Sequence, residues 1–162
     1  MELYLEIFFS KIVDGKIVYA RNFINITQEG SNPDSLVYKA LGSNFPRLRT
    51  NADNLLIHST SWRYEDANKL VLTYIVYSDE LSFNSRKFMA IPVDKLRVVF
   101  NDDPKVPRPK VVEEHSIISH GFRHLSFLVK NDPVIRRVIS TNLTTLKIFD
   151  EISMALSGLL VV

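Results

Sequence analysis

Cysteine is absent from the 162-residue sequence. Without it the chain cannot form disulfides, use a thiolate nucleophile, or bind zinc or iron–sulfur clusters through sulfur. Because structural disulfides are typical of exported proteins, this absence agrees with a cytoplasmic location. The first residues, MELYLEIFF, place Glu2 and Glu6 where a signal peptide needs a basic stretch and an unbroken apolar one, so we expect no export.

Long apolar runs and a strong net charge are also missing. No stretch approaches the ~20 consecutive apolar residues of a transmembrane helix, and the mean hydropathy is +0.02. Lysine and arginine number 20 against 18 acidic residues. The basic residues are scattered along the chain, whereas nucleic-acid-binding proteins concentrate them in a dense patch. We therefore expect a soluble protein that binds neither nucleic acid nor membranes.

The composition itself is ordinary, with 46% hydrophobic and 23% charged residues, as in soluble globular domains. We predict a single domain over residues 1–162, strand-rich in 1–100 and helical in 111–162, with the proline-rich connector NDDPKVPRPK at 101–110 between them. Strands followed by helices are typical of the α+β class. We expect an antiparallel or mixed β-sheet from the N-terminal two-thirds, covered by C-terminal helices.

Two strands are expected near the N-terminus, at residues 3–9 and 16–26, joined as a hairpin by the turn-forming VDGK. A short helix, DSLVYKALG, follows, and Gly42 is placed to end it. Residues 87–100 predict one or two further strands, with Pro92 at an edge, a bulge or a break.

The clearest hairpin covers residues 55–77, where LLIHSTSWRYE and KLVLTYIVY flank the turn DAN. β-Branched and aromatic residues dominate both arms. We align Glu65 with Lys69 across this turn. The pairs that then share one face are Tyr64–Leu70, Trp62–Leu72, Thr60–Tyr74 and His58–Val76. This face is the more apolar one, so we expect it to face the core, together with Trp62 and His58.

After the connector the sequence changes to a helical pattern. The helices expected there span residues 111–130, 133–140 and 143–160. The Asp-Pro pair at 132–133 and Asn142 occupy positions that favour helix starts. On the first of these helices the apolar residues form one stripe, and His120 and His124 lie about 40° apart at its boundary. We therefore expect both histidines to be half-buried.

Histidines four residues apart on a helix can share a metal ion, and His58 is a third candidate ligand beside His120 and His124. The residue after His120 is Gly121, whereas the metalloprotease motif H-E-x-x-H has glutamate there. No further ligand is fixed by the sequence. We predict no metal and no cofactor.

Two H-x-[ST] patterns, HST at 58–60 and HLS at 124–126, are similar to the twin motifs of the 2H phosphoesterase family. In that family each histidine serves as acid or base and each hydroxyl holds the phosphate. Both family motifs lie on strands, with further strands after the second. Here His124 lies in a helical pattern and the chain continues in helices, so the context that the family requires is missing.

Besides the metal site and the phosphoesterase-like motifs, a third possible site would bind an anionic or polar ligand. Its candidate ligand-binding residues are Arg63, Arg123, Trp62 and Thr60. Its candidate catalytic residues are His58, His120 and His124. Together they would form an enzyme acting on a phosphate-containing small molecule. The structural alternative is that the histidines lie at the edge of the core and that Trp62 packs against its neighbours.

Two segments, LLIHSTSWRYE and GFRHLSFLVKNDP, resemble segments of a set of small bacterial proteins of uncharacterised function. This resemblance implies no activity, cofactor or partner. The order of strands, short helix, long hairpin, FMAIPVDKL and C-terminal helix is similar to the Nudix succession. The segment PDSLVYKALGSNFP lacks the glutamate cluster of the Nudix box. The Nudix-like order therefore implies a fold and not metal-dependent diphosphate hydrolysis.

The sequence contains no convergent catalytic motif, and our first hypothesis is a soluble cytoplasmic binding or interaction module. The terminal LSGLLVV is apolar enough either to dock internally or to pair with a second copy in a homodimer. The alternative is the histidine-dependent enzyme, and the sequence leaves open which of the two applies.

Overall fold

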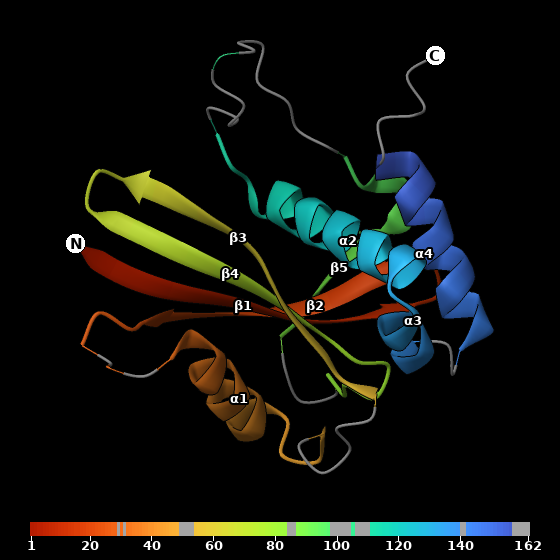
Figure 1. Cartoon of the computed structure of the whole chain (residues 1–162), viewed down its shortest axis with the longest axis horizontal. Coiled ribbons are helices and arrows are strands. Elements are labelled where there is room, and N and C mark those ends of the chain that lie inside the picture. Colours follow the sequence, from red (N-terminus) through yellow and green to blue (C-terminus); the bar gives the residue numbers. More distant parts are fainter. Residues whose placement is uncertain are drawn as a thin grey trace. The chain divides into compact units, whose positions relative to one another are not determined.

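The structure is a computed structural model that describes residues 1–28, 30, 32–48, 54–83, 87–97, 105, 111–139 and 142–156. The chain divides into two compact units, residues 1–90 and 91–162, and each is described by itself. Among the described residues there are five strands and four α-helices, most of the helices C-terminal, which confirms the α+β class (Figure 1). We also expected the C-terminal helices to cover the sheet and the chain to form a single domain. Both of these stay predictions.

The strands form one mixed sheet in the order β3-β4-β1-β2-β5. Their bounds are β1 (Glu2–Val13), β2 (Lys16–Asn25), β3 (Leu56–Asp66), β4 (Lys69–Tyr77) and β5 (Met89–Pro92). β1 runs antiparallel to β2 and parallel to β4, while β3 and β4 form an antiparallel hairpin. The sheet is therefore mostly antiparallel, and β3 is one of its two edge strands.

The first hairpin forms where the sequence predicts it. Val13 pairs with Lys16 across a two-residue turn, in which Asp14 has φ 49° and Gly15 has φ 70°. Both central residues at positive φ define a type I′ turn, whose twist matches that of the flanking strands. Glycine tolerates this conformation and aspartate is among the few other residues that do, which explains the Asp-Gly at this position.

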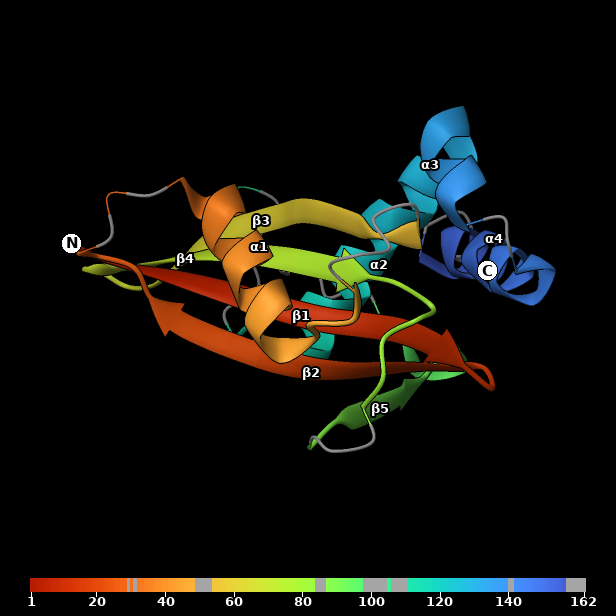
Figure 2. The same cartoon turned by 90° about the horizontal axis from the view of Figure 1, so that it is seen from below.

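The helix α1 (Pro33–Asn44) packs on one face of the sheet (Figure 2). The side chain of Asn32 accepts a hydrogen bond from the Asp34 N–H and begins the helix. The helix continues to Asn44, two residues beyond Gly42, so the predicted end was wrong. The buried core residues that the strands and α1 share include Leu5, Ile7, Phe9, Val37, Leu41, Phe45, Tyr74 and Val76.

The register of the β3–β4 hairpin agrees with the prediction in its middle part and departs from it at both ends. Tyr64–Leu70 and Trp62–Leu72 pair as expected. The predicted Glu65–Lys69 pair was wrong, because Asp66 pairs with Lys69 and a register shift leaves Glu65 as an extra residue. A shift between Ser59 and Ser61 then leaves Thr60 as an extra residue. Because side chains alternate along a strand, one extra residue moves every later side chain to the other face.

The placing of His58 and Thr60 was therefore wrong. His58 pairs with Ile75 and not with Val76, and Thr60 is not opposite Tyr74. His58 consequently points to the face opposite α1. Trp62 shares the core-facing side of the hairpin with Leu72, as expected, but it is not buried, because 53% of its surface is exposed.

The second unit contains α2 (Glu114–Asn131), α3 (Pro133–Ile139) and α4 (Leu143–Leu156), close to the predicted helices. Asp132 accepts hydrogen bonds from the N–H groups of Val134 and Ile135, and Asn142 caps α4 in the same way. These two caps confirm the helix starts read from the sequence. The Phe122 ring of α2 stacks with that of Phe149 of α4 at 6.1 Å.

Two segments singled out in the sequence fall largely outside the described residues. Of the connector at 101–110 only Lys105 is described, and of the terminal LSGLLVV only Leu156. Within the described ranges, none of the helices is both long enough and apolar enough to span a membrane.

Candidate functional site

The carboxylate of Glu6 is fully buried on the face of the sheet opposite α1. Its neighbours Leu5 and Ile7 belong to the core under α1, so strand alternation directs Glu6 to the other side. Arg21 from β2 and Arg63 from β3 both bind it, at 2.6 and 2.7 Å. One buried anion on a central strand thus joins strands on both of its sides.

Thr73 completes the ligation of this carboxylate. Its hydroxyl donates to Glu6 Oε2 at 3.0 Å and accepts from Arg63 at 3.0 Å. Thr73 lies directly beside Glu6 in the parallel β1–β4 register. Within the described residues, every buried side-chain polar atom has a hydrogen-bond partner. This is the condition under which a buried charge network stabilises a fold.

Arg63 is the centre of the network. Burial by itself would lower its pKa, but hydrogen bonds and the negative charges of Glu6 and Glu65 raise that pKa above its ordinary value. Its second terminal nitrogen donates to Glu6 Oε1 at 3.2 Å and to Glu65 at 2.8 Å. The guanidinium is thus committed to two carboxylates.

The network extends to the surface through Glu65 and Lys69. Burial would raise the pKa of Glu65, but hydrogen bonds from Lys69 and Arg63 lower it overall. The ammonium of Lys69 lies 2.6 Å from Glu65 and over the rings of Tyr4 and Phe23, at 4.6 and 4.9 Å from their centroids. These contacts fix the end of the β3–β4 hairpin beside the central strands.

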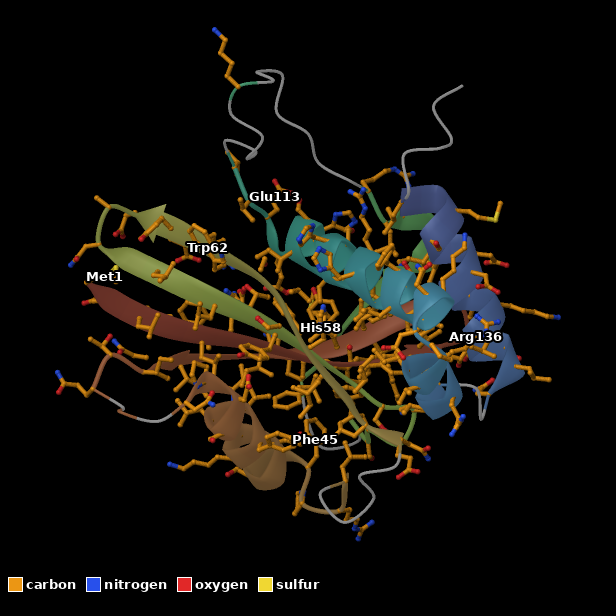
Figure 3. The ribbon with its side chains drawn as sticks, viewed as in Figure 1. Met1, Phe45, His58, Trp62, Glu113 and Arg136 are labelled. Atoms are coloured by element: carbon orange, nitrogen blue, oxygen red, sulfur yellow. The ribbon has the colours of Figure 1, made fainter. Side chains whose placement is uncertain are left out.

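Two aromatic side chains project from the same stretch of β3 on the other face. The rings of Trp62 and Tyr64 meet edge to face at 5.9 Å, the arrangement that aromatic quadrupoles favour. They are 53% and 50% exposed. Figure 3 marks Trp62 and His58 on the same strand. The aromatic pair therefore lies at the rim of the face that carries α1, on an edge strand.

Arg63 lies between the two aromatic residues in the sequence, and its side chain holds the strand from the opposite face of the sheet. Since it points away from them and is held by Glu6, Thr73 and Glu65, the backbone that carries Trp62 and Tyr64 is fixed at its midpoint. A pair of large rings on a fixed backbone is pre-organised for contact, because little conformational freedom is lost when it binds.

The predicted site residues of the first unit fall into different roles. Burial lowers the pKa of His58, which favours the neutral imidazole. Thr60 is buried at the bulge, where its hydroxyl donates to the Thr73 carbonyl at 3.3 Å. Thr60 therefore has a structural partner within the sheet, and Arg63 holds carboxylates of its own chain.

The predicted residues of the second unit lie on α2. The rings of His120 and His124 are 4.4 Å apart between centroids. His124 is half-buried as predicted, whereas His120 is exposed. Arg123 lies between them in sequence, and its carbonyl accepts from Ser126. The structure therefore brings these two histidines together on one helix, while His58 belongs to the other unit.

In the described part of the chain, no group of three or more histidine, aspartate or glutamate side chains could hold a metal ion.

A shallow depression lies on the outer side of α1. It is about 450 Å³ in volume and is lined by Ser35, Tyr38, Lys39, Gly42 and Ser43.

The sequence reasoning missed the role of Glu6. The signal was present, since Glu6 is the one charged residue inside the apolar run LYLEIFF. A lone charge in such a run requires an opposite charge nearby when the strand is buried. Its partners Arg21 and Arg63 are 15 and 57 positions away, so only the sheet topology identifies them.

The chain was compared with family models, with curated proteins and with solved structures, and none of them matches it. The resemblances to small bacterial proteins and to the Nudix order stay hypotheses.

Proposed function

We propose that this chain is a binding module that recognises an extended segment of another protein through Trp62 and Tyr64. The observation that carries the proposal is the exposed edge-to-face pair on an edge strand, fixed from the opposite face by Arg63. Tryptophan and tyrosine dominate the binding energy of protein interfaces. The lack of cysteine supports a cytoplasmic location for such a module.

The size of the pair indicates what binds it. A large aromatic side chain presents about 150–250 Å², and Trp62 and Tyr64 are each about half exposed. Together they offer roughly 200 Å², whereas a stable interface between folded proteins covers about 800 Å² per partner. The pair is too small to hold a second folded copy by itself. A short peptide segment fits this area better.

The chemistry of the tryptophan ring favours a basic or aliphatic side chain in that segment. The face of a tryptophan ring attracts cations, most of all the flat guanidinium of arginine. We therefore expect the bound peptide to place an arginine, lysine or long aliphatic side chain on Trp62.

Selection of short random peptides by display on the whole chain tests this function. Selected peptides should bind the double variant Trp62→Ala/Tyr64→Ala at least about 100-fold more weakly, because these two rings supply the main contact. The matched control is Phe127→Ala, since Phe127 is an exposed aromatic residue on α2. It should bind the same peptides as the unchanged chain does.

Two results would contradict the proposal. One is a selected peptide that binds the double variant as tightly as the unchanged chain. The other is a monomer–dimer equilibrium in sedimentation that disappears in the double variant, which would make a second copy the occupant of the aromatic pair and not a peptide.

The histidine-dependent enzyme is the second candidate function. Two observations favour it: the 4.4 Å approach of His120 and His124, and the lowered pKa of His58, which keeps its imidazole neutral and able to accept a proton. Against it, the Arg63 charge is already bound by carboxylates. Hydrolysis of simple phosphate esters that is lost in both His58→Ala and His124→Ala, with the fold intact, would favour the enzyme.

A further inference from the structure

The residues His120, His124 and Phe127 form a stripe along α2, within the second unit. Four residues advance a helix by about 6 Å along its axis and about 40° around it. This offset places His120 and His124 on neighbouring turns of one side, and their ring centroids are 4.4 Å apart with planes inclined at 52°. Phe127 continues the stripe and is 63% exposed.

The helix that carries the two rings is well fixed. On its other side, Phe122, Leu125 and Val129 are completely buried. The Ser119 hydroxyl accepts a hydrogen bond from the Arg97 backbone N–H at 3.3 Å. The spacing of the two histidines is therefore set by a helix that packing holds in place.

We propose that His120 and His124 bind a divalent transition-metal ion, of the class that prefers imidazole ligands, between their two rings. Imidazole nitrogen binds zinc at about 2.0–2.1 Å, and two imidazoles on one tetrahedral ion place their centroids about 5 Å apart. The observed 4.4 Å is short of this by well under 1 Å. The spacing of the two rings is therefore close to the one that a shared ion requires.

Counting the described residues alone, the site has two protein ligands and leaves the other positions of the ion open. In the described part of the chain a third histidine, aspartate or glutamate does not join the pair. Such a site is unlike a structural zinc site, which is closed by four protein ligands. The open positions are available to water or to a ligand donated by another molecule, and exposure of His120 gives access to them.

Titration calorimetry of the full chain without an affinity tag, with Zn²⁺ as the probe, tests this proposal. His120→Gln and His124→Gln should each lower the affinity about 100-fold, because the second imidazole no longer binds intramolecularly. The matched control is His115→Gln on the same helix, whose imidazole lies 3.0 Å from the Lys95 carbonyl. It should leave the affinity unchanged.

Two further arms identify the ligand chemistry. Mg²⁺ should produce no binding heat, because it prefers oxygen ligands. Zn²⁺ binding should weaken as the pH falls, because a protonated imidazole cannot bind a metal. Unchanged zinc affinity in His124→Gln, or an equal loss in His115→Gln, overturns the proposal. Helical circular dichroism of each variant verifies that α2 remains folded.

Discussion

The guanidinium of Arg63 donates to both carboxylate oxygens of Glu6, 57 positions away in the sequence, at 2.7 and 3.2 Å. The pair links edge strand β3 to central strand β1 across β4, which lies between them. Glu6 is fully buried and Arg63 is 14% exposed. Since a buried ion pair is costly unless every member is satisfied, the complete hydrogen bonding of this network is what makes it compatible with a stable sheet.

Replacement of Glu6 by glutamine should destabilise the protein strongly. The substitution preserves the side-chain size but removes the charge that Arg21 and Arg63 share, and loss of one member of a buried pair costs about 3–5 kcal/mol. Glu65→Gln is the matched control, because Glu65 is 32% exposed and an exposed pair contributes about 1 kcal/mol or less. Urea unfolding with an unchanged slope should show the difference. Equal midpoints for the two variants would contradict this account.

The Asp-Gly turn of the first hairpin should tolerate alanine poorly. Gly15 has φ 70°, where a side chain is strained, so Gly15→Ala should lower the free energy of unfolding by about 1–2 kcal/mol. Gly30 has open space around it and no positive φ. Gly30→Ala should therefore leave the thermal midpoint unchanged or raise it slightly. A similar loss in both variants would mean that turn geometry is not the cause.

Stability should fall below about pH 6.5 because of His58. Burial lowers its pKa in the folded protein from 6.5, so the unfolded chain binds a proton first as the pH falls. The contribution of His58 to stability is therefore complete above the pKa that His58 has in the unfolded chain. It is lost progressively as the pH falls toward the lower pKa that His58 has in the folded protein. His58→Gln should remove this step, whereas His115→Gln should retain it. Denaturant titrations between neutral and mildly acidic pH measure both, and a step unchanged in His58→Gln would refute the assignment.

The start of α3 depends on one side chain. Asp132 Oδ1 accepts from the Val134 and Ile135 N–H groups at 2.8 and 3.2 Å, so Asp132→Ala should cost about 1 kcal/mol. Asp132→Asn keeps an acceptor in the same place and should lose only a small part of that. Chemical denaturation of the two variants separates loss of the cap from loss of the charge. An equal loss of stability in both variants would mean that the charge of Asp132, and not its hydrogen bonds to the helix, is the cause.

The elements of this fold were predictable wherever local chemistry decides them. VDGK, Asp132 and Asn142 have side chains or backbone freedom that act within a few residues, and the structure has a turn and two helix starts there. The bulge at Thr60 was not predictable, because HSTSW carries no residue that forces one. A single extra residue then reversed the face assigned to His58.

The candidate site was only partly predictable. The sequence identified Trp62 and Tyr64 as aromatic residues on a strand. Their exposure depends on which part of the sheet α1 covers, and the sequence did not predict that. The charge network depends on a parallel β1–β4 pairing between residues 67 positions apart, such as Glu6 and Thr73. Periodicity within a segment contains no information about that pairing.

The central claim is that Trp62 is a binding residue on a fixed strand, and its own fluorescence tests it most directly. Trp62 is the chain's single tryptophan, so iodide quenching of the emission reports the exposure of this side chain alone. The account predicts efficient quenching in the free protein and strong protection, with emission at shorter wavelength, when a display-selected peptide is bound. A peptide that binds with full affinity while Trp62 remains equally quenched would contradict it.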